Sequence, residues 1–378
     1  MKNRVWFVLL LCAGSLLLTA CTATDPNNLF ETTQGNPADT TAVTAADTES
    51  TGSGKQSGTN EFDGSVMFEE GYQYGNMQKN IPSGDYMLLG NEVLFQVCSN
   101  GRFIMYSYEL TTGQVSPLCK DATCRHRDCV AGGVFCNTEV YKGKAYSLSS
   151  GHQIIEIKDD EQELVAKAGV ISFFHHDNKL YIRSMDNSFV VLEENGEMRE
   201  LIEEFTGYWN LIFGQYMYAT GSDSVLRYDL TAEKPEAEIL VSNAGGITDG
   251  QHIYYTDYDT YYLYRCDMDG SNVQCLLDQP VLLASMNFDD EYFYYRLFTD
   301  YQLDDGPDTY DIYRFPKSDP GKVEKLATLP VPAYQVFTVP GAEKIFVESR
   351  IRTNGEDFDI YVMNTDGSNI TQLEIPEY

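Results

Sequence analysis

The chain has 378 residues and a mass of 42.6 kDa, and 43% of its residues are hydrophobic. Such a composition can bury a sizeable core, which excludes a wholly disordered chain. The formal charge at pH 7 is −31, and so acidic a surface repels phosphate backbones and anionic lipid headgroups. Nucleic acid is therefore not expected as a partner.

The first twenty residues have the organisation of an export signal. A positively charged start precedes an apolar run over residues 5–18, which is too short to span a bilayer comfortably. The next residues complete Leu18-Thr19-Ala20-Cys21, which resembles the lipobox of bacterial lipoproteins. The resemblance implies cleavage before Cys21 and lipidation of its thiol, and several acyl chains make a stable anchor. An ordinary secretory signal with an incidental cysteine is the alternative.

We therefore expect residues 1–20 to be a lipoprotein signal peptide and the mature protein to sit on the extracytoplasmic face of the cell membrane. Residues 22–60 are mainly Thr, Ser, Gly, Asn, Ala and Asp, so they cannot offset the entropy of ordering. Together with Cys21 they form the expected disordered stalk. Residues 61–84 follow as a lead-in segment, and residues 85–378 form the folded domain.

A short pattern recurs seven times in the folded domain, where an aliphatic or small residue precedes an aromatic one just after a turn. The pairs are Leu94-Phe95, Ala145-Tyr146, Leu180-Tyr181, Met217-Tyr218, Ile253-Tyr254, Phe293-Tyr294 and Ile345-Phe346. The aromatics recur 35 to 52 residues apart, and each pair is followed by a second alternating run, a polar hairpin and a third run.

Four antiparallel strands repeated about every forty residues, without helix signals, are typical of a β-propeller. We predict an all-β fold, a propeller of seven four-stranded antiparallel blades across residues 85–378. Six blades is the alternative, in which the first unit (85–119) is an incomplete accessory sheet. A two-domain β-sandwich is the other alternative, but it does not explain the recurring register of the aromatics.

Some of these repeats resemble those of known propellers. Tyr254-Tyr255-Thr256-Asp257 resembles the Tyr-Trp-Thr-Asp signature of low-density-lipoprotein-receptor propellers, and segments 263–272 and 360–369 are similar to the blade hairpin of TolB-type propellers. Combined with the lipobox and the stretch 117–126, they resemble uncharacterised propeller lipoproteins of clostridial Gram-positive bacteria. The resemblance implies the fold and leaves the ligand open.

Strand order decides which face carries the long connections. With the strands of a blade named a to d from the axis outward, the b–c loop and the connection to the next blade leave the same face. The longest insertions are one such connection (116–137) and the b–c loops at 298–311 and 354–358. Long loops on a rigid scaffold often bind ligands, and sequence-tolerant decoration is the alternative.

Tyrosines, carboxylates and arginines gather on that face. Rings stack on sugars or apolar groups, and carboxylates accept hydrogen bonds from hydroxyls or hold Ca²⁺. The candidate ligand-binding residues are Tyr258, Asp259, Tyr261, Tyr301, Asp304, Asp305, Tyr310, Arg350 and Arg352, with Asp257, Asp308 and Asp357 beside them.

Cysteines concentrate in the first long insertion. Cys119, Cys124, Cys129 and Cys136 surround His126 with the spacing C-x4-C-x-H-x2-C-x6-C, and Cys98 falls in the neighbouring b–c loop. In an exported protein, disulfides would staple a loop that has no core of its own. Alternatively, thiolates with or without His126 would bind Zn²⁺ or iron. We rank disulfides first because neither pair has the two-residue spacing of a zinc knuckle.

The second pair, Cys266 and Cys275, flanks one c–d hairpin and is a candidate disulfide. Beyond these metal candidates no cofactor is expected. No phosphate loop, nucleophile elbow or His-Glu-x-x-His run occurs in the sequence. His175 and His176 are expected at a turn or a strand end.

The function predicted from these features is a membrane-anchored module for ligand or protein recognition, or a scaffold, with a protein or glycan as partner. One alternative is an extracytoplasmic hydrolase or lyase that acts on glycans or peptides through a pair of carboxylates. The other is a metal-binding module built on the cysteines and His126.

Overall fold

The computed structural model describes residues 86–376 apart from 100–101, 122, 127–128, 159–160, 167–168, 194–195, 208–209, 282, 298–309, 331–332, 340 and 350–358. The predicted signal peptide, lipidated Cys21 and stalk lie outside the described residues. No helix in these ranges is long and apolar enough to cross a membrane.

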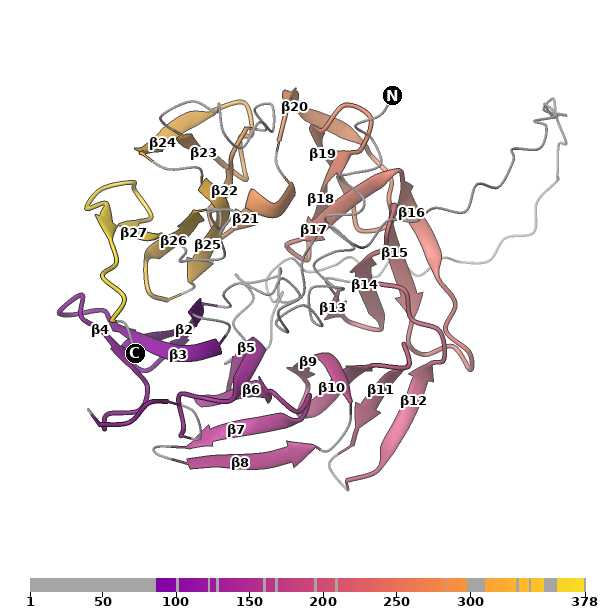
Figure 1. Cartoon of the computed structure of the whole chain (residues 1–378). Helices are drawn as coiled ribbons and strands as arrows, with labels where there is room; N and C mark the ends of the chain where they lie inside the picture. The colour runs from indigo at the N-terminus through magenta and orange to yellow at the C-terminus, as the bar shows by residue number, and fades with distance from the viewer. Residues whose placement is uncertain are drawn as a thin grey trace, which may run out of the picture.

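Seven four-stranded antiparallel sheets make up the described chain, and each consists of four strands that are consecutive in the sequence. Figure 1 shows the sheets arranged around a common axis, with the first strand of each innermost. The predicted seven-bladed propeller is confirmed. The first unit is a complete blade, so the six-blade alternative is wrong.

The first four blades cover the described chain up to residue 242. Blade 1 contains β1 (Met87–Leu89), β2 (Glu92–Ser99), β3 (Arg102–Glu109) and β4 (Val115–Pro117). Blade 2 contains β5 (Val134–Tyr141), β6 (Lys144–Ser149), β7 (Ile154–Lys158) and β8 (Glu161–Ala166). Blade 3 contains β9 (Val170–His176), β10 (Lys179–Ser184), β11 (Phe189–Leu192) and β12 (Met198–Ile202). Blade 4 contains β13 (Asn210–Phe213), β14 (Tyr216–Thr220), β15 (Ser224–Asp229) and β16 (Glu238–Ser242).

Three further blades complete the ring. Blade 5 contains β17 (Ala244–Thr248), β18 (His252–Asp257), β19 (Tyr262–Asp267) and β20 (Gln274–Pro280), and the short 3-10 helix η3 (Leu283–Ser285) follows it. Blade 6 contains β21 (Asn287–Phe288), β22 (Tyr292–Tyr295), β23 (Tyr310–Pro316) and β24 (Glu324–Leu329). Blade 7 contains β25 (Ala333–Val339), β26 (Lys344–Ser349), β27 (Ile360–Asn364) and β28 (Thr371–Gln372).

The seven aliphatic–aromatic pairs all lie in the second strand of their blades, and all fourteen side chains are at most 8% exposed. In blade 2 the aromatic Tyr146 comes two residues after Lys144, which pairs with Tyr141 across the a–b turn. In blade 1 the first residue of the second strand to pair across the a–b turn is Glu92, which pairs with Leu89. Two residues after Glu92 comes Leu94, whereas the predicted aromatic is Phe95. The predicted pair in blade 1 is therefore one residue out of register.

A shift of one residue along a strand moves a side chain to the other face of the sheet. Phe95 accordingly packs toward blade 7, with its ring stacked on Tyr86 at 5.4 Å between centroids and 6.4 Å from Phe346. Leu94 clusters instead with Val140 and Ala145 of blade 2.

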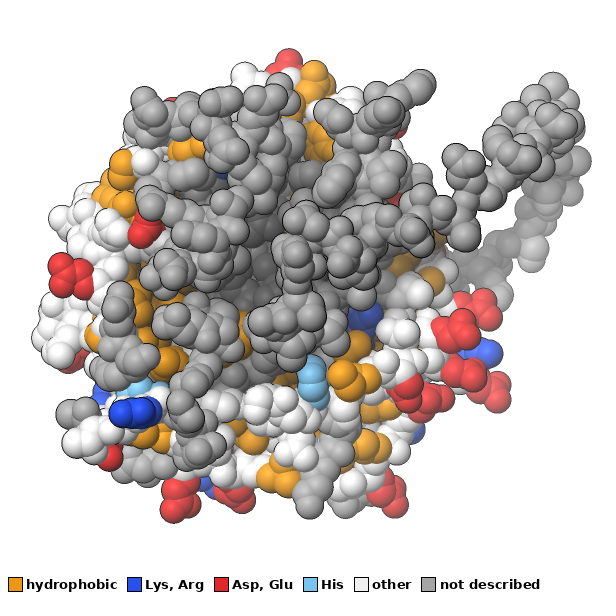
Figure 2. All heavy atoms as spheres, viewed as in Figure 1, with side chains coloured by type: hydrophobic (Ala, Val, Ile, Leu, Met, Phe, Trp, Pro, Cys, Tyr) orange, Lys and Arg blue, Asp and Glu red, His pale blue; other side chains and the backbone are white. Residues whose placement is uncertain are grey.

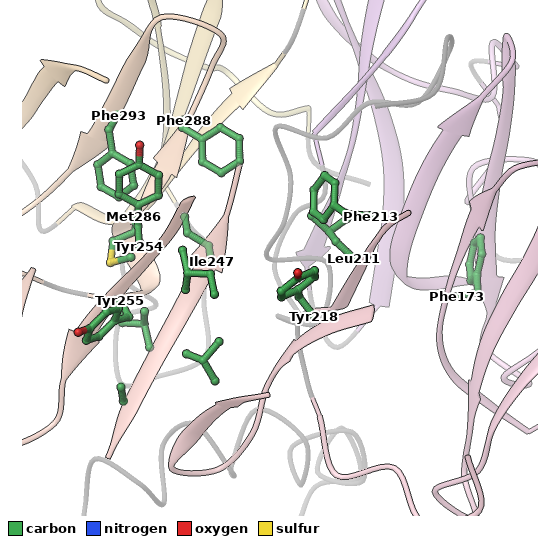
Figure 3. Close-up of a cluster of buried hydrophobic side chains, with 14 of the residues drawn as sticks. Phe173, Leu211, Phe213, Tyr218, Ile247, Tyr254, Tyr255, Met286, Phe288 and Phe293 are labelled. Carbon is green, nitrogen blue, oxygen red and sulfur yellow. The ribbon is translucent and has the colours of Figure 1, made fainter. Parts of the chain in front are cut away.

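Aromatic and aliphatic side chains fill the spaces between neighbouring blades. Tyr254 of blade 5 packs against Phe293 of blade 6 with the ring centroids 4.7 Å apart, and Figure 3 shows both beside Phe288. Leu211, Phe213 and Tyr218 of blade 4 join the same cluster. The core of this fold therefore lies between the blades. Burying one such side chain contributes about 1.5–3 kcal/mol to stability.

Side chains close the ring at the junction of blades 7 and 1. Every described blade is made of strands consecutive in sequence, so neither of these two borrows a described strand from the other. Tyr86 packs on Phe346 at 4.6 Å between centroids, and its hydroxyl donates to Glu348 Oε1 at 2.9 Å. Near the other end of the chain, the Tyr106 hydroxyl donates to the carbonyl of Pro376 at 3.0 Å. The two ends of the described chain thus meet at one interface.

We predict that Tyr86→Phe lowers the free energy of unfolding by about 1–3 kcal/mol, because the buried Glu348 carboxylate loses a hydrogen-bond donor. The matched control is Tyr255→Phe. Tyr255 is 6% exposed, and no hydrogen bond from its hydroxyl occurs in the described chain. Urea denaturation of the full chain measures both, and equal losses would contradict the role assigned to Tyr86.

Candidate metal centre

The insert between β4 and β5 completes an unfinished sheet edge. Strand β3 has eight residues but its outer neighbour β4 has three, so part of β3 would lack a partner. The insert takes that place. Leu118 N donates to Met105 O, and Met105 N donates to Ala131 O, both at 2.9 Å.

The same insert is fastened to blade 2. The side-chain amide of Gln162, in β8, lies within 3.3 Å of three carbonyl oxygens of the insert, to which it donates. They belong to Cys129, Val130 and Gly132. The insert therefore packs between the outer parts of blades 1 and 2.

Three cysteines and one histidine of the insert converge on one point. The ligand atoms of Cys119, Cys124, His126 and Cys129 all lie within 4.8 Å of one another. Cys129 Sγ is 3.5 Å from His126 Nδ1. A tetrahedral Zn²⁺ with Zn–S of about 2.3 Å and Zn–N of about 2.0 Å has a sulfur–nitrogen edge of about 3.5 Å. These four residues could hold a metal ion.

The turn that brings them together is centred on His126. Its backbone has a φ of 50°, in the left-handed region that a histidine adopts less readily than glycine. The His126 N–H donates to Cys124 Sγ at 3.3 Å, a contact of the kind that orients a metal-binding sulfur.

Burial favours the neutral forms of these ligands. Burial, with a smaller contribution from the neighbouring Cys124 and Cys119, raises the pKa of the Cys129 thiol to about 11. Burial also lowers the pKa of His126, against the opposing charge of Asp121. A neutral imidazole is ready to bind a cation, and a cation at the centre of the group would in turn favour the thiolates.

The donor set suits a structural centre. Three sulfurs and one nitrogen complete a tetrahedron, so no coordination position is left for water or substrate. His126 is 2% exposed. Such a centre would tie together a loop that has little core of its own.

The structure changes the ranking of the cysteine predictions. Cys119, Cys124 and Cys129 are free thiols, gathered as the metal interpretation requires, although disulfides ranked first from the spacing. The two-residue spacing of a zinc knuckle is not needed, because the left-handed turn at His126 brings the ligands together. Cys98 was predicted in the b–c loop of blade 1, but it lies in β2, paired with Phe103, so this placement was wrong. Cys136 lies in β5, and the side chains of both cysteines are outside the described residues.

The candidate disulfide between Cys266 and Cys275 is not formed, and both are free thiols. Cys275 pairs with Tyr264 in the strand register, so it does not lie opposite Cys266. Cys266 is 1% exposed, and burial raises the pKa of its thiol to about 12, which makes it an unreactive core residue.

On the loop face, the structure places Tyr258, Asp259 and Tyr261 in the b–c loop of blade 5, as predicted. Part of this loop is engaged in its own turn, because Asp257 Oδ1 accepts hydrogen bonds from the backbone of Asp259 and Thr260. Asp259 Oδ2 accepts from the side-chain amide of Asn243 at 3.1 Å.

Two of the predicted tyrosines are partly committed to packing. Tyr258 is half-buried over Gly245, where an added Cβ would come within 2.4 Å of the Tyr258 hydroxyl. Tyr310, at the start of β23, lies under the guanidinium of Arg296 at 5.3 Å. The remaining candidates lie outside the described residues, namely Tyr301, Asp304, Asp305, Asp308, Arg350, Arg352 and Asp357.

A buried acid–base pair between blades 2 and 3 was not predicted. Glu139 is 1% exposed, and its Oε2 lies 2.7 Å from His175 Nδ1 while its Oε1 accepts from the His175 backbone N–H at 2.9 Å. The His175 ring stacks on Tyr141 at 4.8 Å between centroids. The strand-end position predicted for His175 is confirmed, but a bulge in β5 hides the inward direction of Glu139 from the sequence pattern.

Comparison with known proteins identifies the fold and no family. No model of a known protein family matches the sequence, and no curated protein matches it. A puromycin-hydrolyzing peptidase of Mycobacterium tuberculosis is similar in structure, with a TM-score of 0.54 and 10% identity over 80% of this chain and 54% of the peptidase. At that identity the likeness shows the fold alone.

Two other solved structures are similar at lower scores. One is a protein described as a 6-phosphogluconolactonase of Bacteroides fragilis, with a TM-score of 0.49 and 13% identity over 77% of this chain and 96% of that one. The other is BamB of Moraxella catarrhalis, with a TM-score of 0.41 and 10% identity over 71% of this chain and 82% of that one.

We predict that the full chain, purified without chelator, carries one tightly bound metal ion, with Zn²⁺ the ion that this donor set favours. Cys124→Ser should abolish metal retention and lower the midpoint of thermal unfolding by several degrees, because the insert loses its tie. Cys275→Ser, which removes an exposed thiol far from the insert in the sequence, is the control and should retain the metal. Elemental analysis with free-thiol counting decides the matter, and a metal-free, oxidised wild-type chain would contradict it.

Proposed function

We propose that this protein is a lipid-anchored, extracytoplasmic β-propeller that acts as a recognition or scaffold module at the cell surface. The observation that carries the proposal is a rigid seven-bladed ring in a chain that begins with a lipobox-like sequence. The ring gives a fixed platform, and the long connections of the sequence leave one face of it. This combination also supports kinship with the clostridial propeller lipoproteins that the sequence resembles.

The position of the chain's entry supports anchoring at a distance. Tyr86 directly precedes β1, the innermost strand of blade 1, and the chain from Cys21 to Tyr86 can span at most roughly 230 Å when fully extended. Figure 2 shows Asp and Glu side chains along the rim of the ring in this view. With a formal charge of −31, the protein repels an anionic bilayer, so acyl chains would supply the attachment.

In this proposal the cysteine–histidine centre is a zinc staple that holds the insert between blades 1 and 2. Its support is the convergence of four ligand atoms within 4.8 Å and the closed donor set. The staple stiffens one part of the ring without taking part in chemistry. Ligand selection is then left to the loop face.

Anchoring is tested by Cys21→Ala in the expressing cell. We predict that the wild-type chain loses residues 1–20 and gains the mass of the acyl groups at its new amino terminus. Cys21→Ala should leave the membrane fraction and lack that added mass, as intact-mass spectrometry and fractionation would show. A mature wild-type chain without lipid would refute the anchoring.

Recognition by the loop face is tested with two tyrosines of blade 6. Tyr310 begins β23 at the b–c loop, whereas Tyr292 begins β22 at the opposite face, and each is half-buried against an arginine. On an array of bacterial surface glycans, Tyr310→Ala should weaken any bound glycan by at least tenfold, because stacking is lost. Tyr292→Ala is the matched control and should bind normally. The reverse pattern would place recognition on the other face.

A further inference from the structure

A polar pocket lies beside the metal centre, in the outer part of blade 1. Its volume is about 330 Å³, and its lining includes Glu92, Glu109 and Asp121 together with the ammonium-bearing Lys120. This volume is at the lower end of the range for small-molecule sites and far exceeds what a single ion fills. Cys119 also lines the pocket, so one wall belongs to the insert that the cysteine–histidine group holds together.

The two glutamates of this pocket are placed against each other. Glu92 of β2 and Glu109 of β3 are direct partners in the strand register. Like charges directly opposite on paired strands are destabilising, and a cation between or beside them removes the repulsion. The hydroxyls of Thr111 and Thr112 each donate to Glu109 at 2.9 Å, which orients its carboxylate without neutralising it.

The contacts of Lys120 show that this side of the pocket binds an ammonium group. Its ammonium lies 3.7 Å from Glu92 Oε1 and 3.4 Å from the hydroxyl oxygen of Ser116. One carboxylate and one serine hydroxyl thus already receive an ammonium that belongs to the chain itself.

A second acceptor pair of the same kind lies next to the first. Ser107 is the strand partner of Ser116, and Glu109 lies two residues further along β3. Ser107 is 1% exposed, lines the pocket, and makes no hydrogen bond through its side chain in the described part of the chain. A ligand in the pocket that donates to this hydroxyl would supply the hydrogen bond that it does not make within the described chain.

We infer that this pocket binds a small organic cation through a primary ammonium group, which donates to Glu109 and Ser107 as Lys120 donates to Glu92 and Ser116. The ligand class is an alkyl amine or an amino sugar. The inference goes beyond the proposed function, because it depends on blade 1 and not on lipidation or on the loop face.

The test is calorimetric titration of the metal-loaded full chain with putrescine at low ionic strength. We expect saturable binding of one putrescine per chain. Glu109→Gln should weaken it by at least tenfold, because the ammonium loses its ionic partner. Glu233→Gln is the charge-matched control, since it removes one exposed carboxylate from the c–d turn of blade 4 and should leave binding unchanged.

Ser107→Ala separates this pocket from a merely acidic surface. The change deletes a hydroxyl that has no hydrogen bond to lose in the described chain, so the midpoint of thermal unfolding should not fall. Putrescine binding should nevertheless weaken by about twofold to tenfold, the effect of one hydrogen bond.

Three results would overturn the inference. Equal putrescine binding by the wild type, Glu109→Gln and Ser107→Ala would show that the acidic surface, not the pocket, attracts the ligand. Absence of saturable binding to the wild type would refute an ammonium site. Calcium binding that Glu109→Gln abolishes, without putrescine binding, would assign the pocket to a metal ion instead.

Discussion

The constraint on which the structure depends is that every blade must bury both faces of its inner strands against a neighbour. A four-stranded sheet with two apolar faces has no stable existence in water, and only a closed ring satisfies all seven at once. Paired apolar residues in the second strand meet this demand, since consecutive residues of a strand point to opposite faces. The outer strands are released from it, as the largely exposed β16 shows.

The junctions between blades meet that demand in different ways. Between blades 5 and 6 the contact is mainly aromatic, with a Lys317–Asp249 ion pair beside it at 3.4 Å. Between blades 2 and 3, Glu139 and His175 share the buried space. Removing either partner of a buried hydrogen-bonded pair is costly, because the other polar group is then left buried without its partner. This junction therefore depends on both Glu139 and His175 being present.

Sequence analysis could predict the architecture because its signal is repeated. Turn, pair and hairpin recur seven times, so an error in one unit does not change the fold, as the shifted pair at Leu94 and Phe95 illustrates. That shift was hidden because Leu94 and Phe95 are both apolar, and either fits the pattern. The strand register, counted from Glu92, is what separates them.

The site was less predictable because it depends on single positions. Spacing alone disfavoured a metal at Cys119, Cys124 and Cys129, because the left-handed backbone of His126 has no signature in composition. Glu139 could not be predicted for a related reason. A bulge in β5 interrupts the alternation of side chains along the strand, so the sequence pattern does not show which face Glu139 points to. Both features depend on the backbone geometry at a single position, and a pattern shared by all seven repeats carries no information about such a position.

The insert lies where it does because it covers a strand edge that would otherwise be exposed. A short β4 leaves the backbone of β3 open, and an open strand edge invites pairing with another chain. Covering it with a loop solves that problem but introduces a segment with few apolar residues, which loses conformational entropy on ordering. A metal tie among Cys119, Cys124, His126 and Cys129 would offset this cost, because its coordination bonds add to the limited apolar packing of Val130 and Ala131. The polar pocket then arises where the tied loop and the strands of blade 1 do not fully meet, which is why Cys119 borders both.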